Sequence, residues 1–318
     1  MLCDMRAILS ALSAGACACL LALSPAAADP HPMTSGASPA PTTDTQVAMT
    51  EETLTIALDL RSAAVQAAVT LENRGPATKL LVGFPCATGD EAGAVDVPCK
   101  VPLTITARGK KVSAKKQKDS KTLQHWIWPM QLAAGEKVEL VVRYRAPLIN
   151  DRYGVPGQGM GSFSYRLTTG ARWAGPIGKL TITLEPLHDA LLFISPPGYR
   201  REPGRITWDL TDHEPTQEVF ILPHPTAGGR LASTLFAPGK RKPASGATPR
   251  ERLAAGDYAR ADVDAALAQL RAPGDWADGW LDTISRVAKL PAPSKDQAAA
   301  CIAESIKLLE ELAARAAR

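Results

Sequence analysis

The sequence carries none of the short signatures by which the common enzyme classes are recognised. No serine lies in a GxSxG turn, and the glycines from Gly175 to Gly178 lack the spacing of a phosphate-binding loop. The five histidines form no HExxH pair and lie beside no Cys-x-x-Cys motif. The sequence therefore predicts no catalytic residue, no cofactor and no metal-binding residue.

Excess charge and aromatic side chains are both scarce. The 318 residues carry a formal net charge of only +4, and aromatic residues make up 5% of the chain. Nucleic acid is therefore not an expected partner, because a protein that binds it needs clustered positive charge and aromatic side chains that stack on bases. Hydrophobic residues make up 45% of the chain, which excludes wholesale disorder, and the length suggests two or three domains.

An apolar stretch near the start of the chain has the features of an export signal. The run from Ala7 to Leu23 has no charge, and Ala26-Ala27-Ala28 supplies the small residues that signal peptidase accepts. We expect residues 1–28 to be a signal peptide, the mature chain to be periplasmic or extracellular, and no transmembrane span to remain after cleavage. A lipoprotein anchored at Cys17 is the less favoured alternative, because Ala14-Gly15-Ala16-Cys17 lacks the leucine of a lipobox.

Removal of residues 1–28 leaves the three cysteines Cys86, Cys99 and Cys301. Cys86 and Cys99 flank a segment rich in Gly, Asp and Pro, so an oxidising compartment favours a disulfide between them. A two-thiol metal site is the alternative, but no histidine or second cysteine pair lies nearby. Cys301 lies in a helical pattern and is predicted to be a small buried hydrophobic residue.

The periodicity of the apolar residues divides the mature chain into segments. Residues 29–45 are rich in Pro, Thr, Ser and Ala and predict a flexible tether. Period-two alternation then predicts an N-terminal β-sandwich lobe over 46–149 and a second β lobe over 150–223. A Pro- and Gly-rich linker over 224–247 precedes a C-terminal helical domain over 248–318. The predicted fold is therefore mainly β, with two antiparallel β-sandwich-like lobes followed by a small C-terminal α-helical bundle.

Capping signals mark two helix starts in the C-terminal domain. Thr248 with Glu251 has the spacing of a capping box, and Ser294 with Gln297 has the same spacing before the last helix. In that last helix one face is apolar, and it consists of Ile302, Ile306, Leu309 and Ala313.

Four segments are candidates for function, and each has a structural alternative. The run from Arg108 to Lys121 contains seven basic residues and one acidic residue, so it could bind an anionic partner or protect a sheet edge. The cluster from Asp209 to Glu214 could serve acid–base chemistry or bind a divalent ion, but a polar turn is favoured. Trp126 and Trp128 share one strand face, which favours core burial over a sugar-stacking platform.

Trp173 lies in a glycine-rich turn and is the candidate ligand contact. Gly170 and Gly175 flank it, and binding residues are concentrated in such loops. The alternative is a buried plug at the junction of the two lobes, which is favoured slightly because large aromatic side chains are usually buried.

Several strings of residues carry a resemblance to a known family. They are the segment 47–56, Leu71-Glu72-Asn73, Val82-Gly83-Phe84-Pro85 and the string Thr-Gly-x-x-Trp-x-Gly-Pro-Ile-Gly at 169–178. Over about residues 45–223 the chain resembles the secreted bacterial family known as domain of unknown function 4424. The resemblance implies an extracytoplasmic β-rich protein with no established activity, so it supplies no active-site residues. The chain departs from the family pattern where Cys86 follows Pro85.

Three functions remain open from the sequence. The first is a non-enzymatic β-sandwich module that binds an envelope protein, a glycan or an anionic lipid surface. The second is a hydrolase with an unrecognised site, and the third is a carbohydrate-binding module that uses Trp173.

Overall fold

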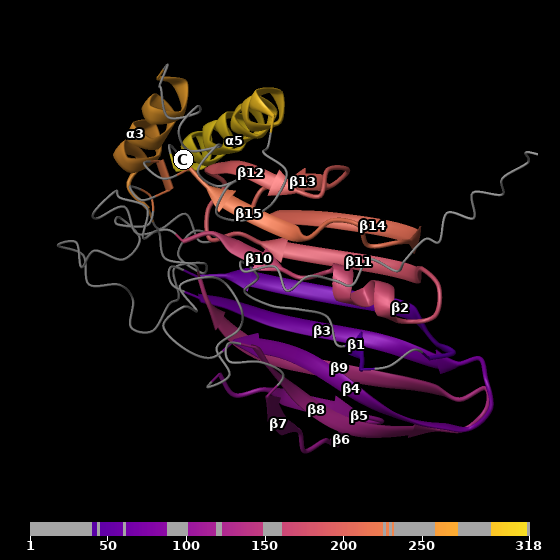
Figure 1. Ribbon diagram of the computed structural model, residues 1–318. Coiled ribbons are helices and arrows are strands. Elements are labelled where there is room, and N and C mark those ends of the chain that lie inside the picture. Colours follow the sequence, from indigo (N-terminus) through magenta and orange to yellow (C-terminus); the bar gives the residue numbers. More distant parts are fainter. Residues whose placement is uncertain are drawn as a thin grey trace, which may run out of the picture. The chain divides into compact units, whose positions relative to one another are not determined.

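Period-two alternation of apolar and polar residues produces the long central strands of the fold. In β3 (Ser62–Asn73) every second residue from Ala63 onward is buried, and the residues between them are half-buried. β2 (Val47–Leu58) and β9 (Lys137–Pro147) pair with β3 on either side, both antiparallel (Figure 1). Because successive side chains point to opposite faces, each strand turns one apolar face to the core.

The computed structural model describes residues 40–42, 45–59, 62–87, 101–118, 123–148, 161–224, 227–228, 231, 258–272 and 294–316. The remaining strands are β1 (Ala40–Pro41), β4 (Thr78–Ala87), β5 (Thr104–Ala107), β6 (Lys110–Lys111), β7 (Lys115–Lys118), β8 (Leu123–Leu132), β10 (Phe163–Tyr165), β11 (Ile177–Glu185), β12 (Leu191–Ser195), β13 (Arg200–Glu202), β14 (Arg205–His213) and β15 (Val219–Pro223). The helices with described bounds are the 3-10 helix η2 (Thr168–Arg172) and the α-helices α3 (Arg260–Arg271) and α5 (Lys295–Ala316). The predicted signal peptide, most of the tether, most of the linker and the Thr248 capping box lie outside the described residues.

An eight-stranded sheet joins strands from both predicted β lobes. Its order is β13-β14-β11-β2-β3-β9-β5-β6. β11 pairs with β14 in antiparallel fashion and with β2 in parallel fashion, so that Ile182 lies beside Leu54. The parallel pair is compatible with the long stretch of chain between the two strands, since parallel neighbours cannot be joined by a tight turn.

A four-stranded sheet, β1-β4-β8-β7, shares a core with the strands β2, β3, β9 and β5 of the eight-stranded sheet. Phe84 of β4 meets Tyr144 of β9 edge-on, with ring centroids 5.2 Å apart. Trp128 of β8 is fully buried in the same core, while Trp126 is half-buried against it. The fold is thus mainly β and built of packed sheets, as the sequence predicted.

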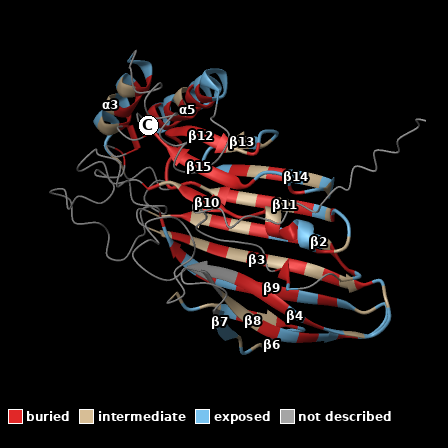
Figure 2. Cartoon of the chain, in the orientation of Figure 1, coloured by how far each residue is buried: buried red, intermediate tan, exposed pale blue. Residues whose placement is uncertain are grey.

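A three-stranded sheet, β10-β15-β12, is covered on both faces. In β15, Val219 and Ile221 belong to the main core, whereas Phe220 and Leu222 belong to a second core shared with α3 and α5. All five residues of β15 are buried, which explains the continuous apolar run at this point in the sequence (Figure 2).

Helix α5 begins at the predicted capping box and packs against β12. Ser294 N donates to Gln297 Oε1 (2.9 Å), and Gln297 N donates to Ser294 Oγ (3.1 Å). These reciprocal bonds satisfy amides that the first helical turn leaves without helical partners. Cys301 is 2% exposed, so its predicted burial is confirmed.

The short strand β1 lies inside the segment predicted as a tether. Ala40 pairs with Gly83 and Pro41 with Val82 at the edge of the four-stranded sheet. Thr42 N also donates to Leu81 O at 3.0 Å. Main-chain pairing orders this stretch, although it offers no large apolar side chain to bury.

Candidate functional site

The turn that carries Trp173 forms a packed corner between η2 and β11. Trp173 is 3% exposed and belongs to the main core. Its amide donates to Gly170 O (3.2 Å), and the amide of Ala174 donates to Val47 O (2.9 Å). This burial agrees with the plug alternative, because a ligand could stack on the indole only after the ring had left the core. Ligand contact at Trp173 stays a prediction.

Two glycines of the same turn have conformational or steric reasons to be glycine. Gly175 has a φ of +75°, a conformation that L side chains rarely adopt. A Cβ on Gly178 would lie 2.6 Å from Thr50 O, where β11 comes alongside β2. These two glycines therefore have a structural role at the corner where β11 comes alongside β2.

A buried carboxylate that the sequence did not single out holds the start of this corner. Glu218 is 5% exposed and accepts hydrogen bonds from the amides of Leu167 and Thr168. The hydroxyl of Thr168 donates to the other oxygen of Glu218 at 2.6 Å. Glu218 thus satisfies amides at the start of η2, which is a structural role for a buried carboxyl group.

A buried polar cluster centres on Arg201, where α5 packs near β12 and β13. Arg201 Nη2 donates to Asp189 O (2.6 Å) and to Ser305 Oγ (3.1 Å). Arg201 Nη1 donates to Cys301 O (3.3 Å) and lies 3.4 Å from Glu304 Oε2. The side chain of Arg201 is only 4% exposed, so these bonds replace its hydration.

Ser305 and Asp189 complete the cluster from opposite sides. Ser305 Oγ accepts from Leu191 N (3.1 Å) and lies 2.9 Å from Leu191 O. Both carboxylate oxygens of Asp189 accept from Gly204 N at 3.2 Å. The cluster therefore links β12, β13 and the turn after β13 to α5. A serine within the apolar stripe of the last helix was the sequence signal that could have revealed it.

The protonation states of Cys301 and Tyr199 do not favour nucleophilic chemistry. They agree with a role of the cluster in holding α5 against the sheet. Burial raises the pKa of the Cys301 thiol to about 11, although the charge of Arg201 acts in the opposite direction. Burial also raises the pKa of Tyr199, whose hydroxyl lies 3.2 Å from Glu304 Oε2. Both groups are protonated at neutral pH, and a protonated thiol is a poor nucleophile.

Two buried histidines lie in segments adjacent to the cluster. His188 Nδ1 accepts from Ala190 N (3.1 Å), and His224 Nδ1 accepts from Ala227 N (3.2 Å). Burial lowers the pKa of each to about 4, so both are neutral near pH 7. Within the described ranges no group of three His, Cys, Asp or Glu side chains is placed to hold a metal ion.

Of the acidic residues from Asp209 to Glu214, Asp209 and Asp212 lie within β14 and Glu214 follows its last residue. Asp209 lies 3.6 Å from Arg200 and accepts from the hydroxyl of Thr181 at 3.3 Å. Asp212 is exposed and has a φ of 48°, which asparagines and aspartates at turns adopt. The polar turn that the sequence favoured is therefore wrong for residues 209–213, which belong to β14 and pair with β11. Polar side chains are tolerated there because this end of the strand is exposed or half-buried.

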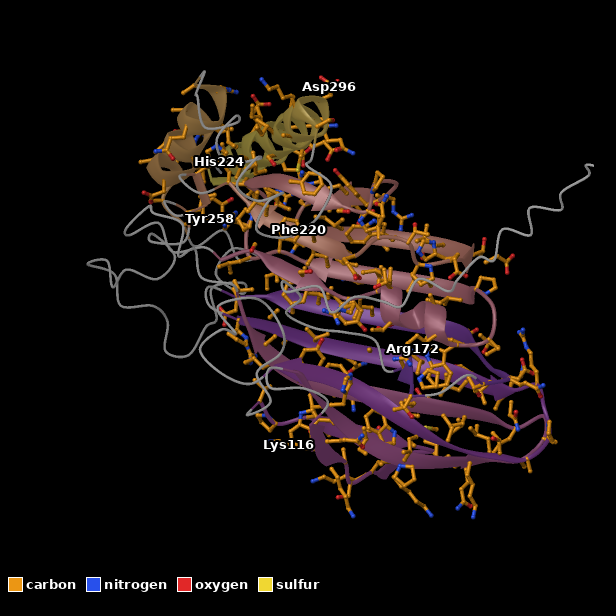
Figure 3. All side chains as sticks on the ribbon, in the orientation of Figure 1. Lys116, Arg172, Phe220, His224, Tyr258 and Asp296 are labelled. Atoms are coloured by element: carbon orange, nitrogen blue, oxygen red, sulfur yellow. The ribbon has the colours of Figure 1, made fainter. Side chains whose placement is uncertain are left out.

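The basic run lies on the edges of two different sheets. β6 is an edge strand of the eight-stranded sheet, and β7 is an edge strand of the four-stranded sheet. We call the exposed residues Lys110, Lys111, Lys115 and Lys116 the lysine edge. None of the four forms an ion pair with another described residue, and Lys116 Nζ lies 4.6 Å from the ring centroid of Trp126 (Figure 3).

The predicted disulfide falls on residues that the structure covers only in part. Cys86 lies in β4, but its side chain is outside the described residues, as is the whole of Cys99. The Cys86–Cys99 bond therefore stays a prediction.

The described part of the chain contains no helix that is both long and apolar enough to cross a membrane. This finding bears on the helices of that part alone.

Comparison with family models and with curated proteins finds no match to the chain. Among solved structures, the chain is similar to a "putative nutrient binding protein" from Legionella pneumophila, with a TM-score of 0.52 and 16% identity. The match covers 87% of this chain and 97% of that protein, so the two share a fold. An M1 zinc metallopeptidase from Deinococcus radiodurans matches 56% of this chain and 42% of its own length, with a TM-score of 0.31 and 12% identity.

Proposed function

We propose that this chain is an exported, non-enzymatic β-sandwich protein that binds a component of the bacterial envelope or of the extracellular space. The export signal and the resemblance to the family of domain of unknown function 4424 support the compartment. The shared fold with the Legionella protein supports a binding role, since nutrient binding is what the name of that protein describes.

The lysine edge is the observation that carries the proposal. Its four lysines are exposed and lack carboxylate partners among the described residues, so their positive potential is available to an outside ligand. By contrast, the buried groups around Arg201 and Glu218 are engaged in holding elements together. The part of the chain that the structure describes thus directs its unpaired charge outward.

Binding through this surface requires no chemical step. Lysines attract an anionic surface over roughly 8 Å at physiological ionic strength, and salt weakens the attraction. Association should therefore be fast and salt-dependent. The buried Trp173 offers a sugar no face on which to stack, so no observation on the described residues favours the carbohydrate-binding alternative.

The test is a binding isotherm of the purified full chain on isolated envelope fragments, at low and at physiological ionic strength. Lys111→Gln/Lys115→Gln removes two charges from the lysine edge. The matched control, Lys179→Gln/Lys307→Gln, removes two exposed charges elsewhere. We expect the first variant to bind about tenfold or more weakly, with a shallower salt dependence, and the control to bind like the wild type. Equal binding by both variants, or binding that salt does not weaken, would contradict the proposal.

A further inference from the structure

The outer face of the four-stranded sheet combines exposed apolar side chains with lysines. Leu81 of β4 is 42% exposed, the one large hydrophobic side chain among the described residues that is this open. It pairs across the strands with Pro129 of β8, which is also exposed, and Ile127 of β8 is half-buried next to it. Their strand neighbours Val82 and Trp128 point the other way, into the core.

Lysines flank this apolar centre on two sides. Lys115 of β7 pairs with Ile127, and Lys79 precedes Leu81 by two residues on the same face of β4. Both lysines are exposed, and neither forms an ion pair with another described residue. Lys115 also belongs to the lysine edge, so this face and that edge share one residue.

We infer that this face, defined by Lys79, Leu81, Lys115, Ile127 and Pro129, docks on an anionic lipid surface. The inference rests on the proposed function and names its partner. Lysine stems reach phosphate-bearing headgroups while the apolar side chains between them enter the boundary between headgroups and acyl chains.

The residue types favour a lipid surface over an acidic protein. Lysine is a flexible point charge without the bidentate geometry of arginine, and protein–protein interfaces are depleted of it. Lysines on β7 also disfavour the addition of a strand from another chain at that edge. A fluid anionic surface requires no fixed pairing geometry, so clustered lysines around a small apolar centre are sufficient to bind it.

The experiment measures binding of the full chain to vesicles of phosphatidylcholine with and without phosphatidylglycerol. We expect binding only when phosphatidylglycerol is present. Lys79→Gln/Lys115→Gln should weaken binding about 25-fold, at roughly fivefold per lysine, and the control Lys179→Gln/Lys307→Gln less than about twofold. Leu81→Asn should weaken binding about threefold to fivefold without changing its salt dependence, because it removes apolar contact and no charge.

The outcomes separate this inference from the proposed function. Salt-dependent binding to native envelope fragments with no binding to phosphatidylglycerol vesicles would overturn the lipid inference alone and point to an acidic protein or glycan. Failure to bind both would overturn both claims. Equal weakening by the Lys79/Lys115 pair and by the control pair would overturn the assignment of this face. All variants are compared after their melting temperatures have been shown to match the wild type.

Discussion

At Trp173 a large aromatic side chain is enclosed where η2 turns into β11. Trp173 is buried, and Gly178 lies close to Thr50. Small changes in side-chain volume at this corner should therefore lower the stability of the fold. The burial of Trp173 agrees with the plug alternative, and ligand contact at this turn stays a prediction.

We predict that Trp173→Ala destabilises the protein by about 3 to 5 kcal/mol, because it leaves a cavity in the main core. Urea unfolding measures the change, and Trp173→Phe should lose less. The opposite pattern, an unchanged stability with lost binding to envelope fragments, would restore Trp173 as a ligand contact.

His188 gives stability a predictable dependence on pH. Burial and the nearby charge of Arg201 lower its pKa from 6.5 to about 4. As the pH falls below 6.5, His188 becomes protonated in the unfolded chain but stays neutral in the folded chain. The free energy of unfolding therefore falls until about pH 4. Burial raises the pKa of Asp189, and its protonation offsets part of this loss.

We predict that His188→Asn reduces the acid-induced loss of stability by about 3 kcal/mol between neutral pH and pH 4. Asparagine can still accept the bond from Ala190, so the variant should fold. Unfolding titrations at several pH values provide the measurement. His213→Asn, at a half-buried site, is the control and should change the slope of the free energy of unfolding against pH less. Identical slopes for wild type and His188→Asn would show that His188 is not buried and neutral.

At the scale of elements, the Arg201 cluster explains how α5, which has one apolar face, also acquires a fixed position against β12 and β13. The second core supplies non-directional contact between α5 and β12, whereas Arg201 bonds to specific atoms of Cys301 and Ser305. Hydrogen bonds of a buried charge select one register of the helix, because a shifted helix would leave them unmade.

We predict that Arg201→Met lowers the free energy of unfolding by about 3 to 5 kcal/mol, since it leaves the buried Asp189 without its cationic neighbour. Arg205→Met, on the exposed part of β14, is the matched control and should change stability by less than about 0.5 kcal/mol. Chemical denaturation compares the two, and similar losses for both would contradict the docking role.

The sequence predicted those elements whose signals are local. The alternation in β2 and β3 and the Ser294–Gln297 cap are each contained in a few consecutive residues, and both were found in the structure. The parallel pairing of β11 with β2 was not predictable, because it depends on segments far apart in the chain. The Arg201 cluster was missed for the same reason, since its members come from three separate segments.

For the whole molecule, the distribution of charge links fold to function. The basic run was visible in the sequence, but only the sheet order shows that β6 and β7 lie on the edges of two different sheets. Lysines there protect the edges from pairing with other chains, and the same exposed charges are available to an anionic partner. The fold therefore supports a protein that binds by its surface.

Chemical footprinting of lysines on the unmodified full chain tests this account most directly. The acetylation rate of each lysine is measured with and without native envelope fragments, after the bound fraction has been determined. The account predicts that Lys110, Lys111, Lys115 and Lys116 are protected in the bound state, while Lys179 and Lys307, which are also exposed, react as in free protein. Unchanged reactivity of the lysine edge in bound protein, or equal protection of Lys179 and Lys307, would contradict it.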